Sequence, residues 1–301
     1  MSLELELFEE RRRRTRRKSF FWGALLSGGL VLTAVLILNI DSMSYPHIAV
    51  FQVNGEIQDD PDRDNLLNEI AEDVNVRAVL LRINSPGGSV VGSEALYESI
   101  RDISKKKPVI ALIGGIGASG AYIAALGSDY IFARGNSLVG SIGVMVQYPD
   151  VSELANRLGI TVDVISSSDV KRSPHPLFPM DQVSRGFQEA LIKDSFSWFK
   201  ELIADRRGVS SEVLSEVSQG QLFTGRMAVD LDLVDGIGGQ SDALRKLSSE
   251  NEAFSNLLVR EWVAEGSSGF PWFNILGLSK PSYILSKLRT DFGPMLFSIA
   301  R

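Results

Sequence analysis

The sequence predicts an α/β domain, and three features indicate it. The chain has 301 residues, of which 44% are hydrophobic, so it can bury a substantial core. From Tyr45 onward, short runs rich in β-branched residues alternate with segments whose apolar residues recur at helical spacing. Three glycine-rich segments lie at the ends of predicted strands, where a chain can turn sharply. This alternation of strands and helices favours an α/β fold.

The predicted elements follow one another without an internal repeat. Residues 47–53 form a first strand, 62–73 a helix, 78–83 a buried strand, 90–105 a helix and 108–113 a strand. The second helix carries Leu96, Ile100 and Ile103 on one side. A glycine-rich turn runs into a helix over residues 114–127. The later elements are strands at 130–133, 143–147 and 161–165 and helices at 152–158, 181–207 and 210–217.

A transmembrane anchor is predicted at residues 19–40. This charge-free apolar stretch is long enough to span a bilayer, which takes about 20 residues, whereas the apolar region of a cleavable signal is usually about 7–15 residues. Residues 1–18 form a basic tail with six arginines and a lysine beside the stretch. A twin-arginine signal and a buried globular helix are the alternatives, and the length and the basic flank disfavour both.

The basic tail also predicts the topology. Cationic flanks stay cytoplasmic, so the N-terminus is expected in the cytoplasm. The domain after the anchor is then expected on the extracytoplasmic, periplasmic side of the inner or cell membrane. The whole chain has a net charge of −6, and residues 1–18 carry +3, which leaves −9 for the remainder. Such an acidic body argues against a nucleic-acid partner.

The composition changes near residue 247 and divides the soluble part. We predict one domain at residues 45–247, followed by an appendage at 248–301 that is rich in aromatic residues and proline. No apolar run in the appendage is long enough to span a membrane. Contact with the membrane interface, packing on a neighbouring chain and covering of the domain's own core are its three possible roles.

A serine activated by a lysine is the chemistry that the residue inventory favours. The chain has no cysteine and only two histidines, which removes thiol catalysis and leaves few partners that can activate a nucleophile. Ser119 lies in a glycine-rich run, and Lys171 is the only lysine between Pro108 and Ile192. If Ser119 attacks, Lys171 is the expected base, ahead of the loop residue His175. A helix-capping Ser119 and a solvated loop Lys171 are the alternatives from the residues alone.

Three glycine-rich segments at the ends of predicted strands can supply backbone N–H groups: Asn84–Gly88, Gly114–Gly120 and Gly140–Gly143. Acyl transfer needs such donors about 2.7–3.1 Å from the developing oxyanion. Each segment alone is equally typical of a tight turn. A dinucleotide-binding loop at the second segment is disfavoured because no acidic residue lies near Val139, about 20 residues further on. We therefore predict no cofactor and no metal.

Four motifs in a fixed order resemble a known family. They are Ile83-Asn-Ser-Pro-Gly-Gly88, Gly117-Ala-Ser-Gly-Ala-Tyr122, Gly140-Ser-Ile-Gly-Val144 and Phe223-Thr-Gly-Arg-Met-Ala-Val-Asp-Leu-Asp-Leu-Val-Asp-Gly-Ile-Gly-Gly239. Over residues 48–247 the chain resembles the S49 peptidases, which are the signal peptide peptidase A proteins and their relatives, in their short form with an N-terminal anchor. The resemblance implies an α/β fold of the Clp protease/crotonase type, a spiral of β-β-α units, preceded by one transmembrane helix.

The resemblance also assigns roles to residues. It implies that Ser119 is the nucleophile, that Lys171 is the general base, that Ser141 orients Lys171 by a hydrogen bond, and that the N–H of Gly88 belongs to the oxyanion hole. A lysine amine is a base only when it has lost its proton, so an apolar or hydroxyl-rich setting without a carboxylate is expected around Lys171. A serine–lysine pair is a known variant of the catalytic triad.

Three positions depart from the family pattern. Ala121 and Asp232 stand where relatives often carry glycine, and the segment before Lys171 is serine-rich and lacks a common glycine. Neither of the first two departures removes a catalytic group. Despite the third departure, Lys171 is the only lysine in this part of the chain that is available for the role.

The resemblance implies a membrane-anchored serine endopeptidase with a Ser-Lys dyad. Its expected substrates are apolar peptides, such as signal peptides left in the membrane after their release, lying in a groove as an added β-strand. A homo-oligomeric ring is expected, with the dyad completed either within one chain or between neighbouring chains. The alternatives are a catalytically inactive membrane scaffold of the same fold and a crotonase-type acyl-CoA enzyme.

Overall fold

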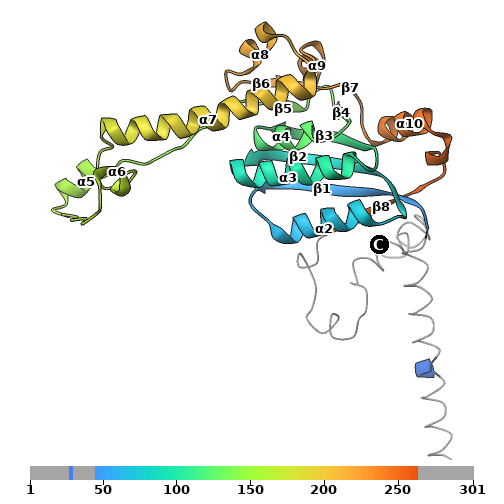
Figure 1. Cartoon of the computed structure of the whole chain (residues 1–301), viewed down its shortest axis with the longest axis horizontal. Helices are drawn as coiled ribbons and strands as arrows, with labels where there is room; N and C mark the ends of the chain where they lie inside the picture. The colour runs from blue at the N-terminus through green and yellow to red at the C-terminus, as the bar shows by residue number, and fades with distance from the viewer. Residues whose placement is uncertain (1–26, 30–44, 264–301) are drawn as a thin grey trace, which may run out of the picture. The chain divides into compact units, whose positions relative to one another are not determined.

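The computed structural model describes residues 27–29 and 45–263 (Figure 1). The predicted basic tail at 1–18, nearly all of the predicted anchor at 19–40 and residues 264–301 of the predicted appendage lie outside the described residues. Within the described part, no helix is both long and apolar enough to cross a bilayer. The described residues from His47 onward belong to one structural unit, which carries the candidate site.

A mostly parallel sheet forms the centre of this unit. Its long strands are β1 (His47–Ile57), β2 (Val76–Gly88) and β3 (Val109–Ala118), which pair in parallel. In the described residues the sheet has eight strands, and its main path runs β6-β5-β3-β2-β1-β8. The long strands are rich in Val, Ile and Leu because parallel strands are usually covered on both faces.

The edge of β3 that faces away from β2 is shared by two short strands. β4 (Tyr130–Ala133) pairs with the first half of β3, and β5 (Leu138–Gly140) pairs with its last residues, Ile116 to Ala118. β5 also pairs antiparallel with β6 (Leu222–Thr224), and β4 pairs in parallel with β7 (Gly236–Ile237). The carboxyl end of β3 therefore lies between β2 and β5.

Helices cover both faces of the sheet. Alternate residues of β1, among them Ala49 and Phe51, pack in one apolar cluster with helices α2 (Pro61–Glu72), α3 (Val90–Ser104) and α4 (Gly120–Leu126). The intervening residues Ile48 and Val50 pack in a second cluster with α10 (Gln240–Glu250). Successive side chains of a strand point to opposite faces, so this alternation builds one apolar layer on each side of the sheet.

The long helix α7 (Gln182–Arg207) carries an arm. We use this name for residues 144–198, which include α5 (Ser152–Arg157), α6 (Asp169–Arg172) and the first part of α7. Figure 1 shows α5 and α6 at the end of α7 that lies far from the sheet. Within the arm only Ala155 and Ser184 are buried, so the arm has almost no core of its own.

The opposite end of α7 is fixed to the body of the domain. Phe199 and Ile203 are buried in the first apolar cluster. The guanidinium of Arg206 donates to the carbonyl oxygens of Leu126 and Ser128, at the end of α4 and just after it, at 2.8 and 2.9 Å. Two short helices, α8 (Ser211–Val217) and α9 (Gly225–Asp230), follow α7.

Two predicted strands are wrong. Residues 143–147 form no strand, and the strand of this region is β5, which ends before the predicted segment begins. Residues 161–165 also form no strand, and Val164 and Ile165 are exposed there. A strand needs a neighbour that pairs its N–H and C=O groups, and no described strand lies beside this segment.

The sheet continues past the predicted domain boundary at residue 247. α10 ends at Glu250, a short 3₁₀ turn η1 (Glu252–Phe254) follows, and β8 (Leu258–Trp262) pairs in parallel with β1. The Nε1–H of Trp262 donates to Nε2 of His47 at 3.1 Å, and the two rings stack. The start of the predicted appendage is therefore part of the domain, because its β-strand completes one edge of the sheet.

The backbone conformation at Asp232 accounts for the glycine that relatives often carry at this position. Its φ of 57° lies in the left-handed region, where glycine is free of the strain that a Cβ causes. Its carbonyl oxygen accepts a hydrogen bond from Nε of Arg207 at 2.7 Å, which glycine would retain. We expect Asp232→Gly to raise the free energy of unfolding by about 0.5–1 kcal/mol. Thermal unfolding of the full-length protein in detergent measures this.

The matched control for this prediction is Asp230→Gly. Asp230 ends α9 and is not among the residues with positive φ, so glycine there should destabilise the fold by about 0.5–1 kcal/mol. Equal destabilisation by both substitutions would contradict the role of backbone strain at Asp232.

Candidate active site

Ser119 occupies the sharp turn between β3 and α4. Its backbone has φ of 52° and ψ of −122°, a conformation that residues with a Cβ rarely adopt. The N–H of Ser119 donates to the carbonyl oxygen of Gly140 at 2.7 Å, and its own carbonyl accepts from Tyr122 at 2.9 Å. These bonds hold the strained turn at the carboxyl end of β3, where α/β folds often carry reacting groups.

The hydroxyl of Ser119 is not used for capping. Its side chain makes no capping hydrogen bond to α4, whereas the side chain of Ser89 caps α3 in the usual way. Ser119 is half-buried. The helix-capping alternative is therefore wrong, and the strained turn presents a hydroxyl without a partner among the described residues.

Gly87 and Gly88 lie against this turn. A Cβ added to Gly87 would lie 2.9 Å from Cβ of Ser119 and 2.8 Å from both the carbonyl oxygen of Ala118 and the nitrogen of Gly120. The φ of Gly87 is 104°, so a side chain would also be strained there. A Cβ on Gly88 would collide with the backbone of Ile57, whose oxygen would be only 1.9 Å away. Gly87 must be glycine because the β2 backbone passes directly beside Ser119, and Gly88 must be glycine because it lies directly against the backbone of β1.

Ser141 lies on the other side of Ser119. β5 pairs with the end of β3 in parallel, with Gly140 opposite Ala118, so Ser141 and Ser119 each follow a paired strand end. Ser141 has φ of 51°, and its N–H donates to the carbonyl oxygen of Gln221 at 2.7 Å. The structure thus brings Ser119, Ser141 and the Gly87–Gly88 segment together.

The helix behind Ser119 is rigidly packed. All seven residues of α4 are buried, including Ala121, which stands where relatives often have glycine. Burial raises the pKa of Tyr122, so its hydroxyl stays protonated, and it donates to the carbonyl oxygen of Leu233 at 2.7 Å. This bond ties α4 to the turn after α9. A fixed helix holds the strained conformation of Ser119 at its start.

Lys171 lies elsewhere in the single chain. It is exposed, within the short helix α6 on the arm, whereas Ser119 follows β3 in the body (Figure 1). Its backbone N–H donates to Oγ of Ser168, and its ammonium group has no hydrogen-bond or ion-pair partner in the described part of the chain. One chain therefore does not bring Lys171 to Ser119 and Ser141, and it does not give Lys171 the enclosed setting expected from the sequence.

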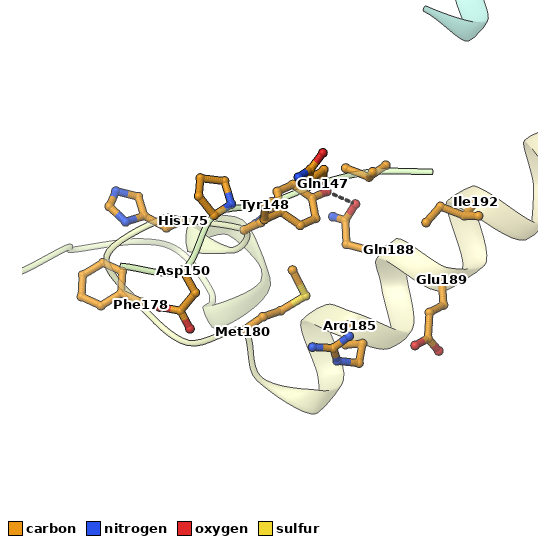
Figure 2. A pocket seen from close by; sticks show the side chains of 13 residues that line it. Gln147, Tyr148, Asp150, His175, Phe178, Met180, Arg185, Gln188, Glu189 and Ile192 are labelled. Atoms are coloured by element: carbon orange, nitrogen blue, oxygen red, sulfur yellow. Dashed lines mark hydrogen bonds between the residues drawn. The ribbon is translucent and has the colours of Figure 1, made fainter. Parts of the chain in front are cut away.

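A hollow of about 420 Å³ also lies on the arm (Figure 2). Its lining includes Tyr148, whose hydroxyl donates to Oε1 of Gln188 at 2.9 Å, and His175, whose ring packs against Phe178. Nδ1 of His175 accepts from the N–H of Leu177, which fits the loop role expected for this histidine. The hollow contains neither Ser119 nor Lys171, so it is not the candidate active site.

Two residues that form hydrogen bonds beside the site were not identified from the sequence. Oγ of Ser85 accepts the N–H of Gly87, and the side chain of Gln221 donates to the carbonyl oxygen of Glu216 at 2.6 Å. Ser85 lies within the Asn-Ser-Pro-Gly-Gly motif, so its place in the motif was the available signal.

In the described residues, no three histidine, aspartate or glutamate side chains gather as metal ligands.

Two family models match this chain over overlapping segments. A model described as Peptidase family S49 matches residues 101–253, about half of the chain. The chain belongs to peptidase family S49. A second model, Clp protease, matches residues 52–139 of this S49 chain. The S49 match covers Ser119, Ser141 and Lys171, and the Clp protease match covers Gly88 and Ser119.

Relatives support the same assignment. The S49 chain is 36% identical over 205 residues to a protein named as a protease from Methanocaldococcus jannaschii, covering 68% of this chain and 66% of that protein. It is 29% identical over 249 residues to Protease 4 from Haemophilus influenzae, covering 79% and 39%. It is 32% identical over 188 residues to a protein named signal peptide peptidase SppA from Enterococcus faecium, covering 62% and 54%. The matched segments span between 39% and 66% of these relatives.

A solved structure supports the fold. A mutant of the 1510-N membrane-bound stomatin-specific protease matches with a TM-score of 0.51 and 18% identity, covering 73% of this S49 chain and 99% of that chain. The α/β class predicted from the sequence is confirmed, with a mostly parallel sheet consistent with the Clp protease fold. S49 is a peptidase family, and these relatives carry protease or peptidase names.

Proposed function

We propose that the protein is a membrane-anchored serine endopeptidase in which Ser119 is the nucleophile. The observation that carries this proposal is the strained turn at Ser119, whose half-buried hydroxyl has no capping bond and lies beside Gly87 and Gly88. Strain at a residue with a Cβ persists where the surrounding structure enforces it, and such sites are often functional. Oγ attacks the peptide carbonyl, and the N–H of Gly88 donates to the oxyanion that forms.

Lys171 is the proposed base, and we place it in a neighbouring chain. The amine of Lys171 accepts the proton of Ser119 as the bond to the carbonyl carbon forms, and it then donates a proton to the leaving amine. A water molecule hydrolyses the acyl-enzyme by the same route. Ser141 orients the amine. Because Lys171 is exposed on the arm, the arm of one copy must reach the Ser119 site of the next copy to complete this dyad.

The exposed apolar surface of the arm supports a homo-oligomer. Many large apolar side chains are exposed within residues 145–191. An exposed apolar surface of this kind is typical of an interface with another chain. The exposed side chains are Met145, Val146, Tyr148, Val151, Leu154, Leu158, Ile160, Val164, Ile165, Val183, Phe187 and Leu191. An interface that covers them also provides the water-poor setting that favours a neutral lysine amine. A ring closes such head-to-tail contacts.

The proposed substrates are apolar peptides, such as cleaved signal peptides that remain in the membrane. The anchor predicted at residues 19–40 would hold the catalytic domain at the extracytoplasmic face, beside substrates in the same bilayer. One relative is named signal peptide peptidase and the similar solved structure is named a membrane-bound protease, which agrees with this choice.

Hydrolysis by the full-length protein in detergent micelles tests the proposal. We expect turnover of a fluorogenic apolar peptide, slower turnover of the same peptide with charged residues at the cleaved position, and covalent labelling by a fluorophosphonate at Ser119. Hydrolysis of an acyl-CoA thioester in place of the peptide would favour the crotonase-type alternative. Absence of both turnover and labelling would favour the inactive scaffold.

A further inference from the structure

We propose that Ser85 is a positioning residue of the active site, which sets the orientation of the Gly87–Gly88 segment beside Ser119. The inference rests on the proposed function, in which Ser119 attacks and the N–H of Gly88 receives the oxyanion. Ser85 itself does not touch the substrate in this account. It acts through the backbone that follows it.

The hydroxyl of Ser85 is committed to this backbone. Ser85 is fully buried, and its Oγ accepts the N–H of Gly87 at 3.1 Å, while the carbonyl oxygen of Gly87 lies 3.5 Å from the same hydroxyl. Such a bond between a serine side chain and the second residue after it closes a tight local turn. A buried N–H must be paired, so loss of this hydroxyl would leave Gly87 unsatisfied or let its peptide rotate.

The Gly87–Gly88 segment needs the hydrogen bond to Ser85 because glycine residues do not restrict their own backbone conformation. Gly87 has φ of 104° and no side chain to restrict it. The ladder between β2 and β3 also shifts register between Ile83 and Ser85, so regular pairing is interrupted just before the turn. Pro86 restricts one dihedral angle, and the bond to Ser85 restricts the next residue. Together they fix the path of the chain past Ser119.

The directions of the N–H groups after Gly87 indicate which of them can reach the oxyanion. Successive N–H groups of a strand point to opposite sides. The N–H of Ser89 donates to the carbonyl oxygen of Ile57 in β1 at 2.8 Å, so the N–H of Gly88 faces away from β1. The nitrogen of Gly88 lies 3.3 Å from the position of a Cβ added to Gly120, the residue after Ser119. With Gly87 bound to Ser85, Gly88 supplies the N–H that faces Ser119.

Ser137 provides a matched control. It is also buried, its Oγ accepts the N–H of Arg134 at 2.9 Å, and it donates to the carbonyl oxygen of Ile113 at 3.0 Å. It therefore makes backbone bonds like those of Ser85, at the turn between β4 and β5. Ser137→Ala should lower the melting temperature about as much as Ser85→Ala, without moving the Gly87–Gly88 segment.

The test compares Ser85→Ala, Ser85→Cys and Ser137→Ala in the full-length protein in detergent. Cysteine replaces the hydroxyl oxygen by a larger sulfur that is a weak acceptor and leaves no cavity, so it serves if the alanine variant does not fold. The measurements are kcat and KM for an apolar peptide and the inhibition constant of a peptide aldehyde of the same sequence. Ser119 adds to such an aldehyde, its proton passes to the base, and the former carbonyl oxygen occupies the oxyanion position.

We expect the Ser85 variants to lower kcat by about 10- to 100-fold with little change in KM, and to weaken aldehyde inhibition by a similar factor. Ser137→Ala should leave kcat and aldehyde inhibition near the wild-type values. Wild-type kcat and inhibition in both Ser85 variants, or an equal loss in Ser137→Ala, would overturn the inference. If the proposed function itself is wrong, the results differ from these. Ser119→Ala would then retain hydrolysis, and the aldehyde would not inhibit the wild type.

Discussion

Ser119→Ala is expected to lower kcat/KM for an apolar peptide by at least about 1,000-fold. Removal of the hydroxyl removes the acyl-enzyme pathway, and the activity that remains comes only from binding and from oxyanion donors. The measurement is steady-state hydrolysis by the full-length protein in detergent, with circular dichroism to verify the fold. Activity within about 10-fold of the wild type would show that Ser119 is not the nucleophile.

Ser119→Gly separates a catalytic role from a structural one. Glycine relieves the strain of a φ of 52°, which costs a residue with a Cβ about 1–2 kcal/mol, whereas alanine retains that strain. We therefore expect the glycine variant to be as inactive as the alanine variant and to melt at a higher temperature than it does. If glycine instead lowered stability, the side chain of Ser119 would have a structural role.

Lys171→Met is the second change with a large expected effect. The loss of the base should lower kcat/KM by about 1,000-fold, because a serine hydroxyl is a weak nucleophile unless a neighbouring group accepts its proton. Lys171 is exposed and makes no side-chain bond within its own described chain, so the stability of an isolated chain should not change. Peptide hydrolysis and the melting temperature measure the two effects.

Lys193→Met is the control for this prediction. Lys193 is also exposed and lies on the arm, in the first part of α7. Its replacement removes one positive charge from the same region and should leave kcat/KM within about threefold of the wild type. Full activity in the Lys171 variant, or equal losses in both variants, would remove Lys171 from the dyad.

The sequence predicted most of the elements around the site because local pattern and turn chemistry determine them. The helices at 62–73, 90–105 and 181–207 were placed within one residue at each end. Apolar spacing fixes such helices, and glycine-rich turns mark where strands end. The roles that the family resemblance implies for Ser119, Ser141 and Gly88 require these residues to lie close together, and the pairing of β3 with β2 and β5 brings their segments together.

Features that depend on contacts with residues far away in the sequence were not predicted. Residues 161–165 have the alternating pattern of a strand, but no described strand pairs with them, and β8 pairs with β1 across about 200 residues of sequence. Ser85 looked like one serine in a glycine-rich motif, because the partner of a buried hydroxyl is set by tertiary structure. The place of Lys171 on an exposed arm could not be inferred either, since spacing along the chain says nothing about its distance from Ser119 in space.

In the proposed dyad Ser119 of one chain works with Lys171 of another, and mixed oligomers test this arrangement most directly. Ser119→Ala and Lys171→Met chains with different tags are co-expressed and purified through both tags, beside each variant purified with itself. In a mixed ring, an interface that joins an intact Ser119 to an intact Lys171 regains the dyad, so hydrolysis should return to about a quarter of the wild-type rate. Mixed oligomers that stay as inactive as either variant alone would contradict the account.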